Sequence, residues 1–215
     1  MTKIELPDSV TYIGSYAFKS CAIESIRIPL GVKQINERTF EGCYYLTEII
    51  WHDGVEAIGS YAFQNCESLT TVEIPKGVYC VWNYAFGSCD SLTRIVISGS
   101  ITAMGECAFY NNPALTTVII KSGTTTIGYG AFAQCANLKT VVLPDTLTSI
   151  AELAFYYSNN IKNVYFGGTA SKWKISIGSY NTTLTNAARY YYSDSQPTES
   201  GNYWHYNENG EPVAW

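Results

Sequence analysis

The chain has 215 residues, of which 47% are hydrophobic and only 14% are charged, so it carries ample apolar surface for a folded core. Its net charge of -5 excludes the basic surface that nucleic-acid binding requires. No apolar run approaches the roughly 20 residues that cross a bilayer. No charged segment followed by an apolar one opens the chain as a signal peptide would.

An internal repeat runs through the first three quarters of the sequence. Its clearest mark is a phenylalanine every 22 or 23 residues, at Phe18, Phe40, Phe63, Phe86, Phe109, Phe132 and Phe155. An apolar residue stands five positions before each phenylalanine, and a leucine or isoleucine follows it at nearly constant distance. One such unit is too short to bury its own apolar side chains, so the units are predicted to stack as a solenoid.

Each unit also contains an apolar-x-apolar pair, the alternation that predicts a strand with one buried face. These pairs are Ile4/Leu6, Ile26/Ile28, Ile49/Trp51, Val72/Ile74, Ile95/Ile97, Val118/Ile120, Val141/Leu143 and Val164/Phe166. They predict a stack of about eight parallel rungs, mainly β in content. The phenylalanine segment between rungs is too short for a helix, and we expect a single helical or 3₁₀ turn there.

The pattern resembles the BspA-like leucine-rich repeat, a 23-residue class. One unit carries it at Leu69, Val72, Ile74, Pro75, Val78, Val81, Ala85, Phe86 and Cys89. The resemblance covers residues 1–166 and implies a leucine-rich-repeat solenoid. It also implies a secreted or surface-attached bacterial protein, a class often assigned to adhesion or host contact.

The two ends depart from the repeat. The chain starts in the middle of a unit, so we expect a truncation at Met1, with any signal peptide lying in the missing part. Residues 167–215 break the period and are predicted to cap the solenoid. A short helical turn is expected at Ser171–Ile175, a strand at Tyr190–Tyr192, and a hairpin from Tyr203 to Trp215, with Asn209-Gly210 suited to a type I′ turn.

Residue types that carry chemistry show no catalytic pattern. Five of the seven cysteines share one phase of the repeat and are expected to stack as buried thiols, namely Cys21, Cys43, Cys66, Cys89 and Cys135. Asn112 and Ser158 stand in the same column. His52 occupies a position where other units have proline, and no cysteine and histidine spacing suits zinc. We therefore predict a non-enzymatic protein with no cofactor and no metal.

The residue between the two apolar positions of each strand points outward. These residues are Glu5, Arg27, Ile50, Glu73, Val96, Ile119, Val142 and Tyr165, so the second half forms an apolar stripe. Threonines and Arg94 form a polar border beside it. An exposed stripe of this kind often marks an interface, although β-branched residues also simply suit a sheet surface. The predicted binding face comprises Ile50, Glu73, Arg94, Val96, Ile119, Val142 and Tyr165.

Three hypotheses for function follow. The first is a recognition or adhesion module that binds a host or matrix protein through this sheet face, outside the cell or at its surface. The second is a carbohydrate- or cell-wall-binding module that uses Trp173, Trp204 and Trp215, although the aromatic residues of the hairpin suit packing on the last coil as well. The third is a structural spacer within a larger surface protein.

Overall fold

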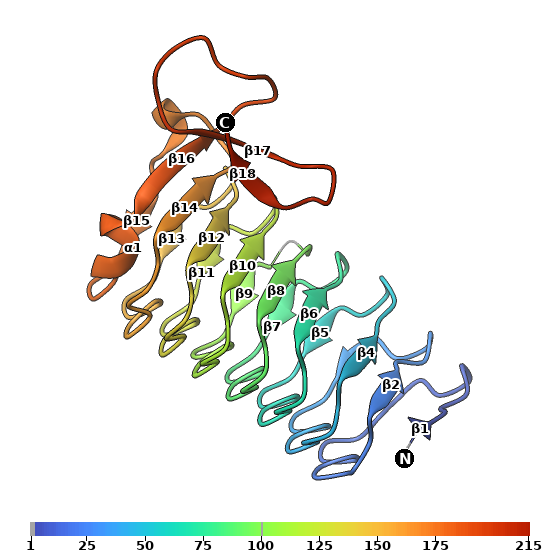
Figure 1. The fold of residues 1–215 in the computed structure, drawn as a ribbon. Helices are drawn as coiled ribbons and strands as arrows, with labels where there is room; N and C mark the ends of the chain where they lie inside the picture. Colours follow the sequence, from blue (N-terminus) through green and yellow to red (C-terminus); the bar gives the residue numbers. More distant parts are fainter. Residues whose placement is uncertain (1–2, 100) are drawn as a thin grey trace.

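A computed structural model describes residues 3–99 and 101–215 and shows a parallel β-solenoid with almost no helix. Successive coils stack along one axis, and the C-terminal segment crosses over one end of the stack (Figure 1). The solenoid predicted from the repeat is therefore confirmed. Met1, at which the truncation is expected, lies outside the described residues.

The long wall of the solenoid contains one strand per coil. Its first three strands form one sheet in the order β1-β2-β4, with β1 at Lys3–Ile4, β2 at Ser25–Arg27 and β4 at Glu48–Ile50. The next six are β6 at Thr71–Ile74, β8 at Arg94–Ile97, β10 at Thr117–Ile120, β12 at Thr140–Leu143, β14 at Asn163–Phe166 and β16 at Ala188–Tyr192. All of these neighbours pair in parallel, with a constant offset of 23 residues from β6 to β14 and an offset of 25 residues between β14 and β16.

A second row of two-residue strands lines the opposite wall. It comprises β3 at Gln34–Ile35, β5 at Ala57–Ile58, β7 at Cys80–Val81, β9 at Ala103–Met104, β11 at Thr126–Ile127, β13 at Ser149–Ile150 and β15 at Ser176–Ile177. The second residue of each strand faces the core, and in β5 and β7 the first residue, Ala57 or Cys80, is buried as well.

The phenylalanine segments form turns of another kind than the single helical or 3₁₀ turn we predicted. Residues two before and two after each phenylalanine have positive φ angles, as at Tyr61 (59°) and Asn65 (58°). The amide of Phe63 donates to the carbonyl of Ala85 in the next coil at 2.8 Å, and the same bond recurs along the stack. Because these amides bond between coils, they are not available for the bonds along the chain that a helix needs.

The core is a ladder of stacked phenylalanine rings. Consecutive ring centroids lie 5.0–5.6 Å apart, with planes within 14° of parallel. Apolar columns from both walls surround the ladder, and from Phe40 onward its rings are almost fully buried. Each coil therefore depends on its two neighbours for burial of its own apolar side chains.

The long wall is interrupted between β4 and β6, which belong to separate sheets. Trp51 follows β4 in a core column where the neighbouring coils have Ile28 and Ile74. Its indole meets the ring of Phe63 edge-on at 5.6 Å. The break in the sheet thus coincides with the one coil in which this core column carries an indole in place of a smaller apolar side chain.

The solenoid extends one coil beyond residue 166, because β15 and β16 pair in parallel with β13 and β14. This last coil contains a 3₁₀ turn, η1, at Ala170–Lys172 and a short helix, α1, at Thr182–Asn186. The hairpin follows, with β17 at Tyr203–Tyr206 and β18 at Pro212–Ala214 paired antiparallel.

The hairpin turn differs from the type I′ turn we predicted. In its loop, Gly210 has a φ angle of +72° and Asn209 does not have a positive one. The Gly210 amide donates to the carbonyl of Asn207 at 2.9 Å, which closes a three-residue loop with a glycine bulge.

Candidate functional site

The outward column of the long wall divides into an open half and a covered half. In the open half, Ile50 is 44% exposed, and Glu5, Arg27 and Glu73 are exposed beside it. In the covered half, Val96, Ile119, Val142 and Tyr165 are between 2% and 9% exposed. These four side chains form a second apolar cluster, separate from the phenylalanine core.

The cover is the C-terminal hairpin of the same chain. After β16, the chain continues into β17, and the hairpin lies across the wall over β14, β12 and β10 toward β8 (Figure 1). Its anchor is Trp204, which is 1% exposed and packs on Tyr165 with ring centroids 5.4 Å apart. The indole Nε1–H of Trp204 donates to the carbonyl of Phe166 at 2.8 Å. The hairpin therefore has both apolar and polar attachment to the last coils.

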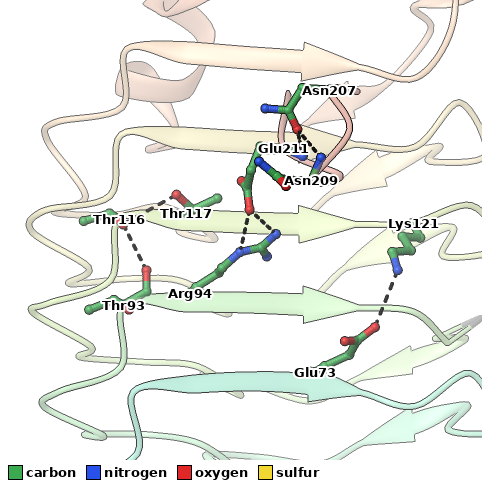
Figure 2. Close-up of polar contacts among 9 residues, drawn as sticks. All are labelled: Glu73, Thr93, Arg94, Thr116, Thr117, Lys121, Asn207, Asn209 and Glu211. Atoms are coloured by element: carbon green, nitrogen blue, oxygen red, sulfur yellow. Dashed lines mark hydrogen bonds and ion pairs between the residues drawn. The ribbon is translucent and has the colours of Figure 1, made fainter. Parts of the chain in front are cut away.

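An ion pair holds the tip of the hairpin to β8. The Glu211 carboxylate accepts hydrogen bonds from Nη2 of Arg94 at 2.7 Å and from Nε at 3.2 Å, as Figure 2 shows. Asn207 orders the loop, because its side-chain oxygen accepts from the amides of Asn209 and Glu211. Arg94 is thus a latch for the hairpin and has its charge already paired.

The prediction that the apolar stripe is exposed is wrong for four of its residues. Val96, Ile119, Val142 and Tyr165 do face outward from the sheet, as the alternation indicates, but the hairpin removes them from solvent. The sequence signal that was missed is the aromatic content of the tail. Its Trp204, Tyr190 and Tyr192 pack against the apolar stripe. A partner could reach these four residues only by displacing the hairpin.

The open half surrounds Ile50 with charge. A cavity of about 320 Å³ lies over this part of the wall and is lined by Ile4, Glu5, Leu6, Ser25, Arg27 and Ile50. The Arg27 guanidinium donates to both carboxylate oxygens of Asp8, at 2.8 and 3.1 Å. These bonds and one from the amide of Leu30 lower the pKa of Asp8. The result is an exposed aliphatic centre with a charged rim that stays ionised at neutral pH.

A groove at the ends of the strands continues from this half. It has a volume of about 500 Å³ and includes Trp51, His52, Glu73, Lys76 and Lys121 among its lining residues. Glu73 accepts from the hydroxyl of Ser98 at 2.8 Å and lies 3.5 Å from the ammonium of Lys121 (Figure 2). His52 has a structural role, because its Nδ1 accepts from the amide of Gly54 and its Nε2 lies 3.0 Å from the carbonyl of Pro29.

The cysteine column supplies hydrogen bonds to the core. The thiol of Cys89 donates to the carbonyl of Phe63 at 3.2 Å, and Cys43, Cys66 and Cys135 make the equivalent bond. Asn112 and Ser158 also donate to a phenylalanine carbonyl from this position, which explains why they substitute for cysteine. Burial raises the thiol pKa of Cys43, Cys89 and Cys135 to about 12, so these thiols are poor nucleophiles. All seven cysteines are free.

The three tryptophans of the carbohydrate hypothesis do not form one platform. Trp204 is buried under the hairpin, and Trp173 lies between the ring of Phe166 and the guanidinium of Arg189. Trp215 is 44% exposed and stacks on His205 at 3.7 Å. Packing accounts for the first two, and only Trp215 offers a large exposed surface.

Further classes of site were sought in the part of the chain that the structure describes. Within residues 3–99 and 101–215, no group of three or more histidine, cysteine or acidic residues is arranged to hold a metal ion. No helix in these ranges has the length and hydrophobicity of a membrane span.

Comparison with known proteins agrees with the solenoid. The model of the BspA type leucine-rich repeat region (6 copies) matches residues 1–112 and 56–185. A search of curated proteins gave no match.

Three crystal structures share the fold. A leucine-rich repeat protein from Bacteroides ovatus ATCC 8483 is 24% identical with a TM-score of 0.59, over 86% of this chain and 54% of that one. The T. pallidum leucine-rich repeat protein is 25% identical with a TM-score of 0.59, over 68% and 69% of the two chains. A leucine-rich repeat protein from Eubacterium ventriosum ATCC 27560 is 18% identical with a TM-score of 0.56, over 98% and 68%. The present chain thus spans about half the length of the Bacteroides ovatus protein, and it belongs to the BspA-type leucine-rich repeat family.

Proposed function

We propose that this chain is a non-enzymatic recognition module of a secreted or surface-attached bacterial protein. Its partner is a protein of the host or its matrix, bound by the open half of the long wall. Ile50 and Glu73, predicted from the sequence, are the central residues of this surface. Val96, Ile119, Val142 and Tyr165 would take part only after displacement of the hairpin, and Arg94 serves as its latch.

The observation that carries the proposal is the exposure of Ile50 inside a charged rim. An isoleucine that is 44% exposed on a sheet, beside the partly buried Ile4 and Leu6, loses contact with water when a partner covers it. Charged side chains on either side, Arg27 and Glu73, would give such a contact its orientation. Protein interfaces commonly have this arrangement of an apolar centre and a polar rim.

Substitution of Ile50 by aspartate tests the proposal. We expect binding to host cells and to purified matrix proteins to weaken about 10- to 30-fold, the loss typical of a central interface residue. Because Ile50 is exposed, the thermal midpoint should change little. The matched control is Tyr45→Asp, which puts the same charge at a residue that is 62% exposed and lies away from the wall.

Two results would contradict the proposal. If Ile50→Asp binds as tightly as the unmodified chain, the open half is not the contact surface. If the unmodified chain binds none of the cells or matrix proteins, a structural spacer is the better description.

A further inference from the structure

A cavity lies where the hairpin crosses the ends of β10, β12 and β14, and it shares Lys121 with the groove that continues from the open half. Its volume of about 430 Å³ falls within the range of small-molecule sites. Three separate parts of the chain form it: the strand ends of the long wall, the end of β16 and the β17 strand. The hairpin that covers the apolar stripe therefore also supplies one side of this cavity.

Aromatic rings form one side of this cavity. The Trp204 ring lies nearly perpendicular to those of Tyr192 (5.2 Å, 72°) and Tyr206 (4.9 Å, 77°). Val142 and Leu143 line the wall below. Trp204 itself is almost fully buried, so the half-buried Tyr192 and the exposed Tyr206 present the aromatic surface of the cavity. Their rings are tilted by 50° to each other, an arrangement that suits a puckered ring with an apolar face better than a flat aromatic ligand.

The polar groups of the cavity carry positive charge and hydroxyls. Among the described residues that line it, Lys121 is the only charged one, and Ser122, Tyr192 and Tyr206 bring hydroxyl groups. The ammonium of Lys121 lies 3.5 Å from Glu73, and the two side chains are 50% and 64% exposed. An ion pair this long and this exposed is weak, so a ligand carboxylate can replace Glu73 as the partner of Lys121.

Gly167 keeps part of the cavity open. A Cβ atom at this position would come no nearer than 3.4 Å to any heavy atom, which is ordinary van der Waals contact. A side chain here would thus start in contact with the backbone of residues 143–145 without overlapping it, and because Gly167 lines the cavity, the side chain would reduce the open space. This gives a way to block the site with little strain on the fold.

From this geometry we propose that the cavity binds an acidic sugar, a pyranose ring that carries a carboxylate, alone or at the end of a polysaccharide. The apolar face of the ring packs against Tyr192 and Tyr206, the carboxylate pairs with Lys121, and the sugar hydroxyls meet Ser122 and the two tyrosine hydroxyls. This site adjoins the proposed protein-binding surface through the ion pair of Lys121 with Glu73, but Ile50 does not line the cavity.

Titration of the full chain with D-glucuronate and D-galacturonate tests this assignment, with ligand-observed NMR as the readout. We expect both to bind, and glucose and galactose to bind about tenfold more weakly, the factor for one charge-assisted hydrogen bond. Lys121→Met should lower uronate affinity to the level of the neutral sugars. Its matched control is Lys139→Met, which removes a lysine outside the cavity.

Blocking the cavity gives a second arm. Gly167→Leu should abolish uronate binding, whereas Gly87→Leu, a glycine with similarly ordinary surroundings, should not. The assignment is overturned if neutral sugars bind as tightly as uronates, if benzoate binds as tightly, if the folded chain binds no uronate, or if Lys121→Met binds uronate unchanged. Ile50→Asp should bind uronate normally, which separates this test from that of the protein-binding surface.

Discussion

Removal of the Trp204 side chain is the sharpest test of how the covered half is held. Trp204 is 1% exposed, contacts the rings of Tyr165, Tyr192 and Tyr206, and donates a hydrogen bond to Phe166. Replacement of a buried tryptophan by alanine typically costs about 3–5 kcal/mol, with the lost hydrogen bond included. Because each solenoid coil contacts only its neighbours, we expect this cost to fall on the hairpin and not on the whole stack.

Hydrogen exchange locates the loss. In Trp204→Ala, the amides of β17 and β18 should exchange roughly 10²- to 10³-fold faster, the factor for about 3–4 kcal/mol of local stability. The amides of β8 and β10 should keep their protection, while a dye that binds apolar surface should bind more strongly as the stripe opens.

The control and the refuting result are equally specific. Trp215→Ala removes a ring that is 44% exposed and stacked on His205, so we expect a cost of about 1 kcal/mol. Exchange of β17 and β18 that is unchanged in Trp204→Ala would refute the anchoring role of this residue. Simultaneous loss of protection in every coil would refute the local character of the hairpin.

Two further predictions concern the latch and the thiols. In a double-mutant cycle of Arg94→Gln and Glu211→Gln, we expect urea unfolding to give a coupling energy of about 0.5–1 kcal/mol, because the two side chains are 28% and 44% exposed. The coupling energy should be smaller in 1 M salt. A coupling energy near zero would contradict the role of this ion pair as a latch. Burial raises three thiol pKa values from 9.0 to about 12, so the unfolded state releases protons first and stability should fall as pH rises from 9 to 12. Replacement of Cys43, Cys89 and Cys135 by serine should make the free energy of unfolding depend less on pH between 9 and 12. An unchanged pH dependence would contradict this prediction.

The solenoid itself is predictable because its core residues recur at constant phase. Phe63, Val72 and Leu69 each define a column that recurs in the other coils and is buried in most of them. The apolar pattern of one unit is a weak indication by itself, but seven units with the same pattern can all bury their apolar residues by stacking on one another. For this reason, the strand positions and the outward-facing column were readable from the sequence.

The turn conformation escaped prediction because its cause lies outside the turn segment. Positive φ angles usually reveal themselves through glycine, yet here Tyr61, Tyr84 and Leu153 adopt them. Hydrogen bonds from these turns to the adjacent coil compensate the strain, so the cause lies in a neighbouring unit and not in the segment itself.

The covered half escaped prediction because its contacts are not repeated. Arg94 and Glu211 are 117 residues apart in the chain, and no other coil has an equivalent pair. The fit of Trp204 to Tyr165 and the carbonyl of Phe166 is likewise a single event. Alternation shows which side of a strand faces away from the core, but it does not show whether another segment lies on that side.

The distribution of charge along the outward column nevertheless matches the coverage by the hairpin. The central positions of the open half include Glu5, Arg27 and Glu73, whereas those under the hairpin are all uncharged. A charge beneath the hairpin would have to be buried without water, which costs several kcal/mol unless it is paired. Arg94 is at the border, and it has that pair in Glu211. The uncharged run thus reflects coverage by the chain itself, whereas in the open half the charged residues and Ile50 stand together in solvent.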